Sequence, residues 1–231
     1  MCGRFVQKSK KLELVVKFGC EAQAAAEVPA NYNLSPTQDA AVVRFNLADS
    51  KRHLSLLRWG LVPGWSKDSA VGIKLTNARA ESLTDKPSFR DAALKRRCLI
   101  PVDAFYEWQR TEKVKQPYAF TAQDNGPFAL AGLWEGWRGP DGKILRSFAV
   151  VTTSANEVMS PIHDRMPVIV SPVDWSVWLG EQEGDWQSLL RPCPSEWLTC
   201  WPVSRRVSNG RENNPGLLEQ VSVPQELGNL V

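Results

Sequence analysis

The chain has 231 residues, of which 43% are hydrophobic and 23% are charged, the ordinary balance of a globular protein with one sizeable core. A formal net charge of +3 excludes a uniformly basic nucleic-acid-binding protein, so any such surface must be a local patch. The chain has five cysteines, without a Cys-x-x-Cys pair, and only two histidines, which argues against a disulfide framework and a zinc site. It has no long apolar run. We therefore expect a cytoplasmic protein without metal, cofactor, signal peptide or membrane span.

Helical spacing and a glycine stop predict an amphipathic helix over residues 9–19, followed by a loop over 21–36 that could begin with a short helix. Strand patterns then dominate. They cover residues 40–47, 53–59, 97–101, 105–108, 117–122, 128–137, 146–153 and 166–170. The turns at 123–127 and 139–143 are predicted to be hairpin connections. Further helices are predicted at 88–95, 154–160 and 171–180, the last of them capped by Ser171.

Strands with interspersed helices and no internal repeat predict one α+β domain, mainly antiparallel, with a barrel-like core and peripheral helices. We place this domain at residues 1–223 and expect residues 224–231 to be a loosely held tail.

The chain begins MCGRF, and removal of Met1 would leave Cys2 as a 1,2-aminothiol. Its α-amine has a reference pKa near 8 and its thiol one near 8.5, so both reactive forms exist at neutral pH. The amine can form a Schiff base with an aldehyde, and the thiol can then close a five-membered thiazolidine ring in an intramolecular step. An internal cysteine cannot do this because its nitrogen is an amide. From these five residues alone, a merely small second residue is an equally good interpretation.

Two polar clusters interrupt the apolar pattern. In TNARAES, the residues Asn77, Arg79 and Glu81 would share one face if the segment were extended, although such a face is more often a solvated edge. In FYEW, Glu107 stands between aromatic residues, where the pKa of a carboxyl group would be raised and suited to acid/base work. Spacing alone favours an outward-facing strand residue at position 107.

A third cluster and the aromatic residues complete the candidates. His163 stands in a loop before an apolar strand, a better place for a functional histidine than most, and Asp164 or Arg165 could fix that loop by ion pairing. Trp59 and Trp65 flank a Pro-Gly turn, and PVSRRVSNGREN contributes Arg205. Exposed tryptophans stack on unpaired bases and arginines neutralise phosphates, yet each piece alone is more typical of ordinary core or surface.

Taken in order, these motifs resemble the SRAP family, the SOS-response-associated peptidases that process abasic sites. The matching pieces are MCGRF, YNLSP, RWGLVPGW, NARAES, PVDAFYEW, KQPYAF, LAGLWE, VTTSAN, IHDRMPVI, WPVSRRVSN and NNPGLLEQV. No single piece is specific, but so many in one order are.

The resemblance implies a β-rich domain with a positively charged groove for single-stranded DNA containing abasic sites. It implies that Cys2 forms a thiazolidine crosslink after Met1 is removed by autopeptidase activity, that Asn77 orients Cys2 and the opened sugar, and that Glu107 is the acid/base. It also implies that His163 assists proton transfer, strand cleavage by a lyase step, and reversal of the link. The DNA contacts it implies are Arg4, Arg79 and Trp65, and Arg205 is a further candidate from its own arginine-rich segment. Ser66 departs from relatives that carry a second aromatic there, which puts a base-stacking wedge in doubt.

We expect the crosslink to shield the lesion during DNA repair, in a monomeric protein that joins the nucleoid after damage. Two other functions stay open. An N-terminal Cys-Gly also begins class II glutamine amidotransferases, but that reading gives no role to Glu107 or His163. A non-catalytic module that binds single strands through Trp and Arg would make Cys2 dispensable.

Overall fold

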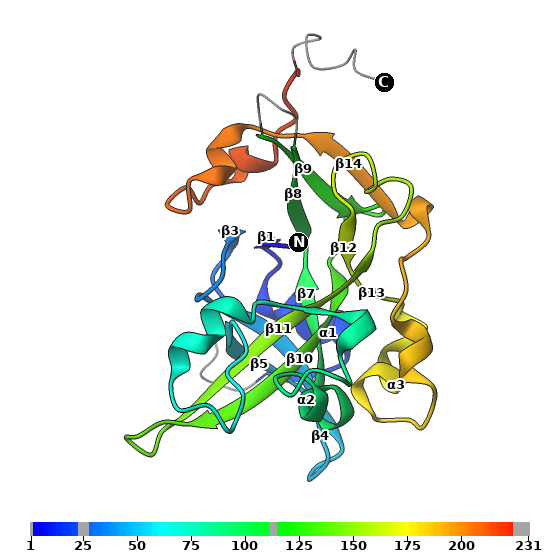
Figure 1. Ribbon diagram of the computed structural model, residues 1–231. Helices are drawn as coiled ribbons and strands as arrows, with labels where there is room; N and C mark the ends of the chain where they lie inside the picture. Colours follow the sequence, from blue (N-terminus) through cyan, green and yellow to red (C-terminus); the bar gives the residue numbers. More distant parts are fainter. Residues whose placement is uncertain (1, 23–27, 111–114, 224–231) are drawn as a thin grey trace.

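The computed structural model describes residues 2–22, 28–110 and 115–223, and its strands fall into two sheets, one above the other in Figure 1. The 14 strands in this part of the chain are β1 Arg4–Gln7, β2 Glu21–Ala22, β3 Asn31–Leu34, β4 Asp39–Asn46, β5 Lys51–Trp59, β6 Asn77–Arg79, β7 Arg97–Val102, β8 Ala104–Arg110, β9 Lys115–Ala122, β10 Phe128–Arg138, β11 Ile144–Ser154, β12 Arg165–Pro167, β13 Ile169–Val170 and β14 Leu198–Pro202. The fold is α+β with strands in the majority, as the sequence predicted.

The larger sheet closes on itself as a barrel. Its strands run in the order β11-β10-β7-β4-β5, and a parallel pairing of Phe148 with Trp59 joins β11 back to β5. Alternate residues of these strands point inward, where Trp59 stacks on Phe148 at a centroid separation of 6.2 Å. The outward-facing residues, such as Val43 and Leu133, form a second cluster beneath the helices.

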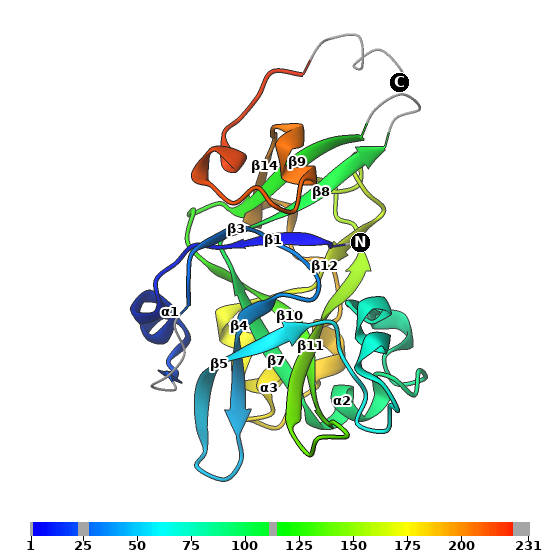
Figure 2. The same cartoon turned by 90° about the vertical axis from the view of Figure 1, so that its left-hand side faces the viewer.

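The second sheet has the order β14-β9-β8-β1-β3, and its strand β1 lies on the side toward the barrel (Figure 2). Phe5 and Phe105 face the cluster that also fills the barrel. Their strand neighbours Val6 and Tyr106 face the opposite way, where Val207 covers them. This sheet is therefore buried on both faces, which fixes the side of β8 on which each residue lies.

Helices cover the outside of the barrel. They are α1 Lys11–Phe18, α2 Arg90–Lys95 and α3 Trp175–Leu179. Short 3-10 turns lie at Ser69–Lys74, Ala80–Ser82, Pro172–Asp174, Trp186–Leu189, Ser195–Trp197, Arg205–Ser208 and Pro215–Leu218, and the last two pack on the second sheet. The first helix ends where its sequence indicates, because Gly19 adopts a left-handed φ of 56° while Leu14 and Phe18 are buried. The helices expected at 9–19, 88–95 and 171–180 are thus confirmed.

Three local predictions were wrong. Residues 157–160 form turns, because the Asn156 side chain accepts a hydrogen bond from the Met159 amide and Pro161 cannot extend a helix. The turn at 123–127 joins β9 to β10, which lie in different sheets, and is no hairpin; the turn at 139–143 is one. Ser171 occupies the cap position of its 3-10 turn but makes no side-chain capping bond.

Two predictions concern residues that the structure does not describe. Residues 23–27, the centre of the short helix suggested after position 21, are not described, and Glu21–Ala22 is strand β2. The expected tail at 224–231 also lies outside the described residues. None of the helices described is long and apolar enough to cross a membrane.

Gly60, the residue after β5, packs tightly against the backbone of Gly72. Its φ is 123°, and a Cβ atom added there would lie 2.6 Å from the carbonyl oxygen of Gly72. We expect Gly60→Ala to lower the free energy of unfolding by about 1–3 kcal/mol, since the new methyl combines backbone strain with a clash. Urea unfolding measures the loss. Gly142→Ala, at φ 79° with no atom within 4 Å, is the control, and an equal loss in both variants would remove the clash from the explanation.

Candidate functional site

The chain start is buried where the two sheets meet. Cys2 is fully buried just before β1 and belongs to the cluster that fills the barrel. Its carbonyl oxygen accepts a hydrogen bond of 2.9 Å from Nδ2 of Asn77, the first residue of β6. The short strand β6 is held in turn by parallel pairing with β11, where Asn77 lies opposite Val150. Asn77 therefore anchors the backbone of residue 2 to the barrel.

Glu107 lies close to the Cys2 side chain. In the pairing of β1 with β8, Arg4 is opposite Tyr106, so the next residue of β8 continues toward the chain start. Glu107 shares the face of Phe105 and is 3% exposed, so it points inward. Burial raises the pKa of the Cys2 thiol, and the charge of Glu107 raises it further. In the chain that carries Met1, both effects favour the protonated thiol.

The loop with His163 is tied to both sides of this site. Gln109, two residues beyond Glu107 on β8, donates a 3.1 Å hydrogen bond to the Pro161 carbonyl. On the other side, Arg165 forms a bidentate ion pair with Glu81 at 2.6 and 2.9 Å and donates to the Thr152 carbonyl. The ion pairing expected for this loop is thus confirmed for Arg165.

Two groups of the protein lie against the same nitrogen of the His163 imidazole. Its Nδ1 accepts a 2.9 Å hydrogen bond from the Arg165 amide and lies 2.9 Å from the exposed carboxylate of Asp164. One nitrogen cannot accept from the amide and donate to the carboxylate at once. The neutral ring accepts from the amide and carries its proton on Nε2, whereas the imidazolium can donate from Nδ1 to Asp164.

Arginines gather around the chain start. The half-buried Arg4 side chain donates to the Gly3 carbonyl at 3.4 Å, and burial lowers its pKa. A Cβ atom on Gly210 would lie 3.3 Å from its Nη2, so the loop that follows Arg205 packs against Arg4. The Asn33 amide donates to the main chain of that loop at 3.0 Å and fixes it to β3. Arg205 itself is exposed.

The remaining DNA-contact candidates differ in position. Arg79 is exposed at the end of β6, two residues from Asn77. Trp65 is 64% exposed, but its neighbour Ser66 accepts a hydrogen bond from Trp137, which pairs with Leu145 on β11. Asn77 pairs with Val150, which is also on β11. Leu145 and Val150 are five residues apart, a separation of about 17 Å at a strand's rise of roughly 3.3 Å per residue. The structure does not bring Trp65 beside Cys2.

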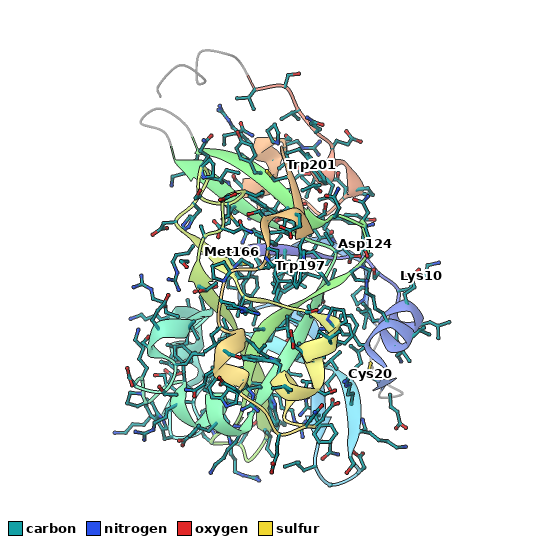
Figure 3. All side chains as sticks on the ribbon, turned by 90° about the vertical axis from the view of Figure 1, so that its right-hand side faces the viewer. Lys10, Cys20, Asp124, Met166, Trp197 and Trp201 are labelled. Atoms are coloured by element: carbon teal, nitrogen blue, oxygen red, sulfur yellow. The ribbon has the colours of Figure 1, made fainter. Side chains whose placement is uncertain are left out.

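The tryptophans are mostly structural. Six of the ten donate their indole N–H within the protein: Trp59, Trp108, Trp137, Trp175, Trp178 and Trp201. Figure 3 shows Trp201 on β14 and Trp197, which is 36% exposed, nearer the barrel. Trp59 is fully buried, which agrees with the interpretation of this residue as ordinary core and excludes stacking of its ring on bases.

The geometry is thus a buried residue 2 with a nearby carboxylate, a histidine loop and the half-buried Arg4, and comparison with known proteins decides the family. A model of the family described as SOS response associated peptidase (SRAP) matches residues 1–210. The chain belongs to the SRAP family. This confirms the resemblance found in the motifs.

Two relatives show how far the similarity extends along the SRAP chain. The abasic site processing protein YoqW of Bacillus subtilis (strain 168) is 39% identical over 224 residues, covering 95% of this chain and 99% of YoqW. The abasic site processing protein HMCES of Xenopus tropicalis is 33% identical over 229 residues, covering 86% of this chain and 68% of HMCES.

Solved structures share the SRAP fold described above. A protein from Bacteroides thetaiotaomicron superposes with a TM-score of 0.86 at 23% identity, covering 96% of this chain and 100% of that one. A protein from Bordetella bronchiseptica reaches 0.77 at 28% identity, covering 88% and 100%.

One polar cluster of the SRAP chain is arranged differently from the prediction. Glu81 does not continue the β6 face of Asn77 and Arg79, because β6 ends at Arg79 and Glu81 lies in the 3-10 turn Ala80–Ser82. There it pairs with Arg165, which lowers the pKa of its carboxyl group. This ion pair was not predicted from the sequence, and neither were Gln109 and Asn33 as supports of the site. Only the polar side chain of Gln109 in an apolar strand was a signal.

The donor set does not suggest a metal. Within residues 2–22, 28–110 and 115–223 the structure holds no group of three or more His, Cys, Asp or Glu side chains that could hold an ion. The side chains of the site offer the chemistry of a thiol, a carboxyl group and an imidazole.

Proposed function

We propose that this protein captures abasic sites in single-stranded DNA through a covalent thiazolidine link to Cys2 once Met1 is removed. The observation that carries the proposal is the placement of residue 2. Its carbonyl oxygen is fixed by Asn77, and its thiol lies within the field of the buried Glu107. The relatives named abasic site processing proteins support DNA with abasic sites as the partner and DNA repair as the process.

The chemistry of ring formation gives an order of steps. The Schiff base must exist before the ring can close, so the α-amine is the first nucleophile, and it adds to the C1 aldehyde of the opened sugar. The carbinolamine loses water to give a Schiff base. The thiol sulfur then bonds to the imine carbon while its proton passes to the ring nitrogen. One water leaves in total, and no oxidant or reductant is needed.

Glu107 is the proton carrier in this scheme. Opening the furanose, dehydrating the carbinolamine and taking up the thiol proton all require a group that can accept and return a proton beside residue 2. Glu107 is the carboxylate whose charge acts on that thiol. Asn77 holds the residue-2 backbone in place, a positioning role.

The two partners at Nδ1 suit His163 to the later sugar chemistry. The neutral ring accepts from the Arg165 amide at Nδ1. When Nδ1 takes up a proton, it can donate to the Asp164 carboxylate instead. We expect His163→Ala to slow strand cleavage and link reversal by roughly 10²-fold or more while leaving adduct formation largely intact. A time course that scores adduct, nicked DNA and free DNA separately measures this. Loss of adduct formation alone would contradict the assignment.

The arginines predict how DNA binds. Arg4, Arg79 and Arg205 would displace phosphate counterions, so initial binding should weaken as salt rises, and each neutralised phosphate adds about −0.7 to the slope for single strands. Arg79→Gln should reduce that slope by about one phosphate.

Because an abasic sugar must open and reach the buried residue 2, single strands should crosslink faster than duplex. Equal rates on both forms would count against this path.

The decisive experiment incubates the protein with an abasic oligonucleotide, followed by denaturing electrophoresis and mass spectrometry. A heat-stable adduct with the mass of Met1-free protein plus DNA less one water is expected. A matched oligonucleotide without the lesion should give none. Absence of the adduct, with release of ammonia from glutamine or with reversible binding alone, would instead favour the amidotransferase or the non-covalent module.

A further inference from the structure

A polar cavity lies at the end of the barrel that faces away from the second sheet. It is next to the turn between β4 and β5, which is at the bottom of Figure 1. Its volume is about 700 Å³, within the usual range for sites that bind small molecules. Four cations line it, contributed by β4, α2, β7 and β11: Arg44, Lys95, Arg97 and Arg146. No Asp or Glu is among its lining residues.

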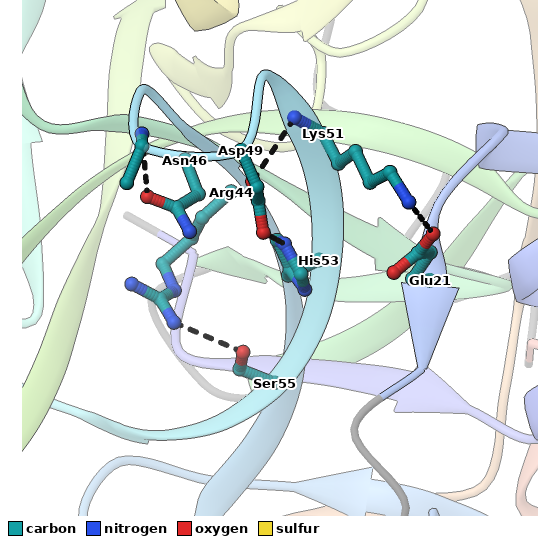
Figure 4. Close-up of polar contacts among 8 residues, drawn as sticks. Glu21, Arg44, Asn46, Asp49, Lys51, His53 and Ser55 are labelled. Atoms are coloured by element: carbon teal, nitrogen blue, oxygen red, sulfur yellow. Dashed lines mark hydrogen bonds and ion pairs between the residues drawn. The ribbon is translucent and has the colours of Figure 1, made fainter.

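Three carboxylates of the neighbouring segments have partners of their own. Glu135 pairs with Arg96, and Glu181 pairs with Arg52. Asp49 lies 2.7 Å from Nε2 of His53 and accepts a hydrogen bond from the Lys51 amide (Figure 4). In the described part of the chain, none of the four cavity cations has an ion pair within 4 Å. The positive charge of the cavity is therefore not neutralised by the protein around it.

Arg44 is held in place for a ligand. It continues the inward-facing row of Ala40 and Val42, its guanidinium lies 4.4 Å from the ring centre of Trp134, and it donates to the Ser55 hydroxyl at 3.0 Å (Figure 4). Its Nε is buried without a hydrogen-bond partner. Burial lowers the pKa of Arg44, and the charge of Arg146 lowers it further, so the two guanidinium groups repel each other.

The other cations complete the binding surface. Arg97 is fixed by donating to the main-chain carbonyls of Trp178 and Ala93 at 2.5 and 2.8 Å, so its charge is held at the wall without a carboxylate. Lys95 and Arg146 are exposed and free to turn toward a ligand. Two repelling arginines favour a ligand with more than one negative charge, and a terminal phosphate carries close to two at neutral pH.

We propose that this cavity is a second anion site, separate from the Cys2 site, that binds a phosphate group. The phosphate can be carried by a small phosphorylated molecule or by a DNA strand, since both present the same oxygens to guanidinium groups. The inference does not depend on the covalent chemistry at Cys2, so the two can fail independently.

Calorimetric titration with pyrophosphate tests the small-molecule source. We compare the wild-type protein with the double variant Lys95→Gln/Arg146→Gln, which changes exposed side chains and should leave the fold intact. Arg138→Gln is the matched control, because Arg138 is also exposed near the β10–β11 turn, outside the cavity lining, and donates to the Gly142 carbonyl. We expect the double variant to raise the Kd for pyrophosphate by about tenfold or more, and the control to leave it unchanged.

A lesion-free single-stranded oligonucleotide tests the other source, scored by fluorescence anisotropy with and without pyrophosphate. If the double variant weakens oligonucleotide binding and pyrophosphate competes for it, the phosphate comes from DNA. If pyrophosphate binds without affecting the oligonucleotide, the ligand is a small phosphorylated molecule. If the double variant changes neither the pyrophosphate titration nor oligonucleotide binding, the site is overturned.

Discussion

Cys2→Ala is expected to abolish the heat-stable adduct with an abasic oligonucleotide. Alanine keeps an α-amine, so a Schiff base can still form and be trapped by borohydride, but no thiol is present to close the ring. The loss should exceed the range of any single proton-transfer residue, because the intramolecular attack of the thiol supplies a large effective concentration. Denaturing electrophoresis with and without borohydride separates the two species.

The matched control for this prediction is Cys98→Ala. Cys98 is also fully buried, and burial likewise raises the pKa of its thiol, but its nitrogen is an amide within β7. Assayed at a temperature where it is folded, this variant should form the adduct normally. Intact mass of the wild-type protein should show the loss of Met1. A stable adduct at the wild-type rate from Cys2→Ala, or from protein that retains Met1, would overturn the mechanism.

The elements of the fold were predictable where the signal is local. The helix at Lys11–Phe18 has helical spacing and a glycine that accepts a left-handed φ, and the turn at 139–143 joins two strands that pair directly. The closure of the barrel was not predictable, since it rests on a parallel pairing of Phe148 with Trp59, 89 positions apart in sequence. Local pattern likewise could not reveal that the strands around 123–127 belong to different sheets.

The site shows the same division between local chemistry and distant packing. The reactivity of Cys2 follows from its place next to Met1 and needs no structure. The inward direction of Glu107 does not follow from spacing, because β8 is buried on both faces and carries Glu107 and Gln109 on the side of Phe105. The anchor from Asn77 to the Cys2 carbonyl joins residues 75 positions apart, and only the pairing of β6 with β11 brings it about.

Glu107→Gln is expected to slow adduct formation by about 10²–10⁴-fold, the usual contribution of a positioned acid or base. The amide keeps the shape and hydrogen-bonding capacity of the side chain but cannot exchange the proton needed for ring opening, dehydration and ring closure. Binding of the abasic strand should persist, since Glu107 is 3% exposed and contributes no positive charge to phosphate contacts. Single-turnover crosslinking and anisotropy on the same oligonucleotide measure the two effects.

Glu135→Gln controls for the loss of a carboxylate elsewhere in the fold. Glu135 is also a poorly exposed strand carboxylate, but it pairs with Arg96 and is not among the charges that act on the Cys2 thiol. Its variant should crosslink at the wild-type rate. A Glu107→Gln protein that crosslinks at the normal rate would make Glu107 a structural residue and leave the proton transfers at Cys2 to another group.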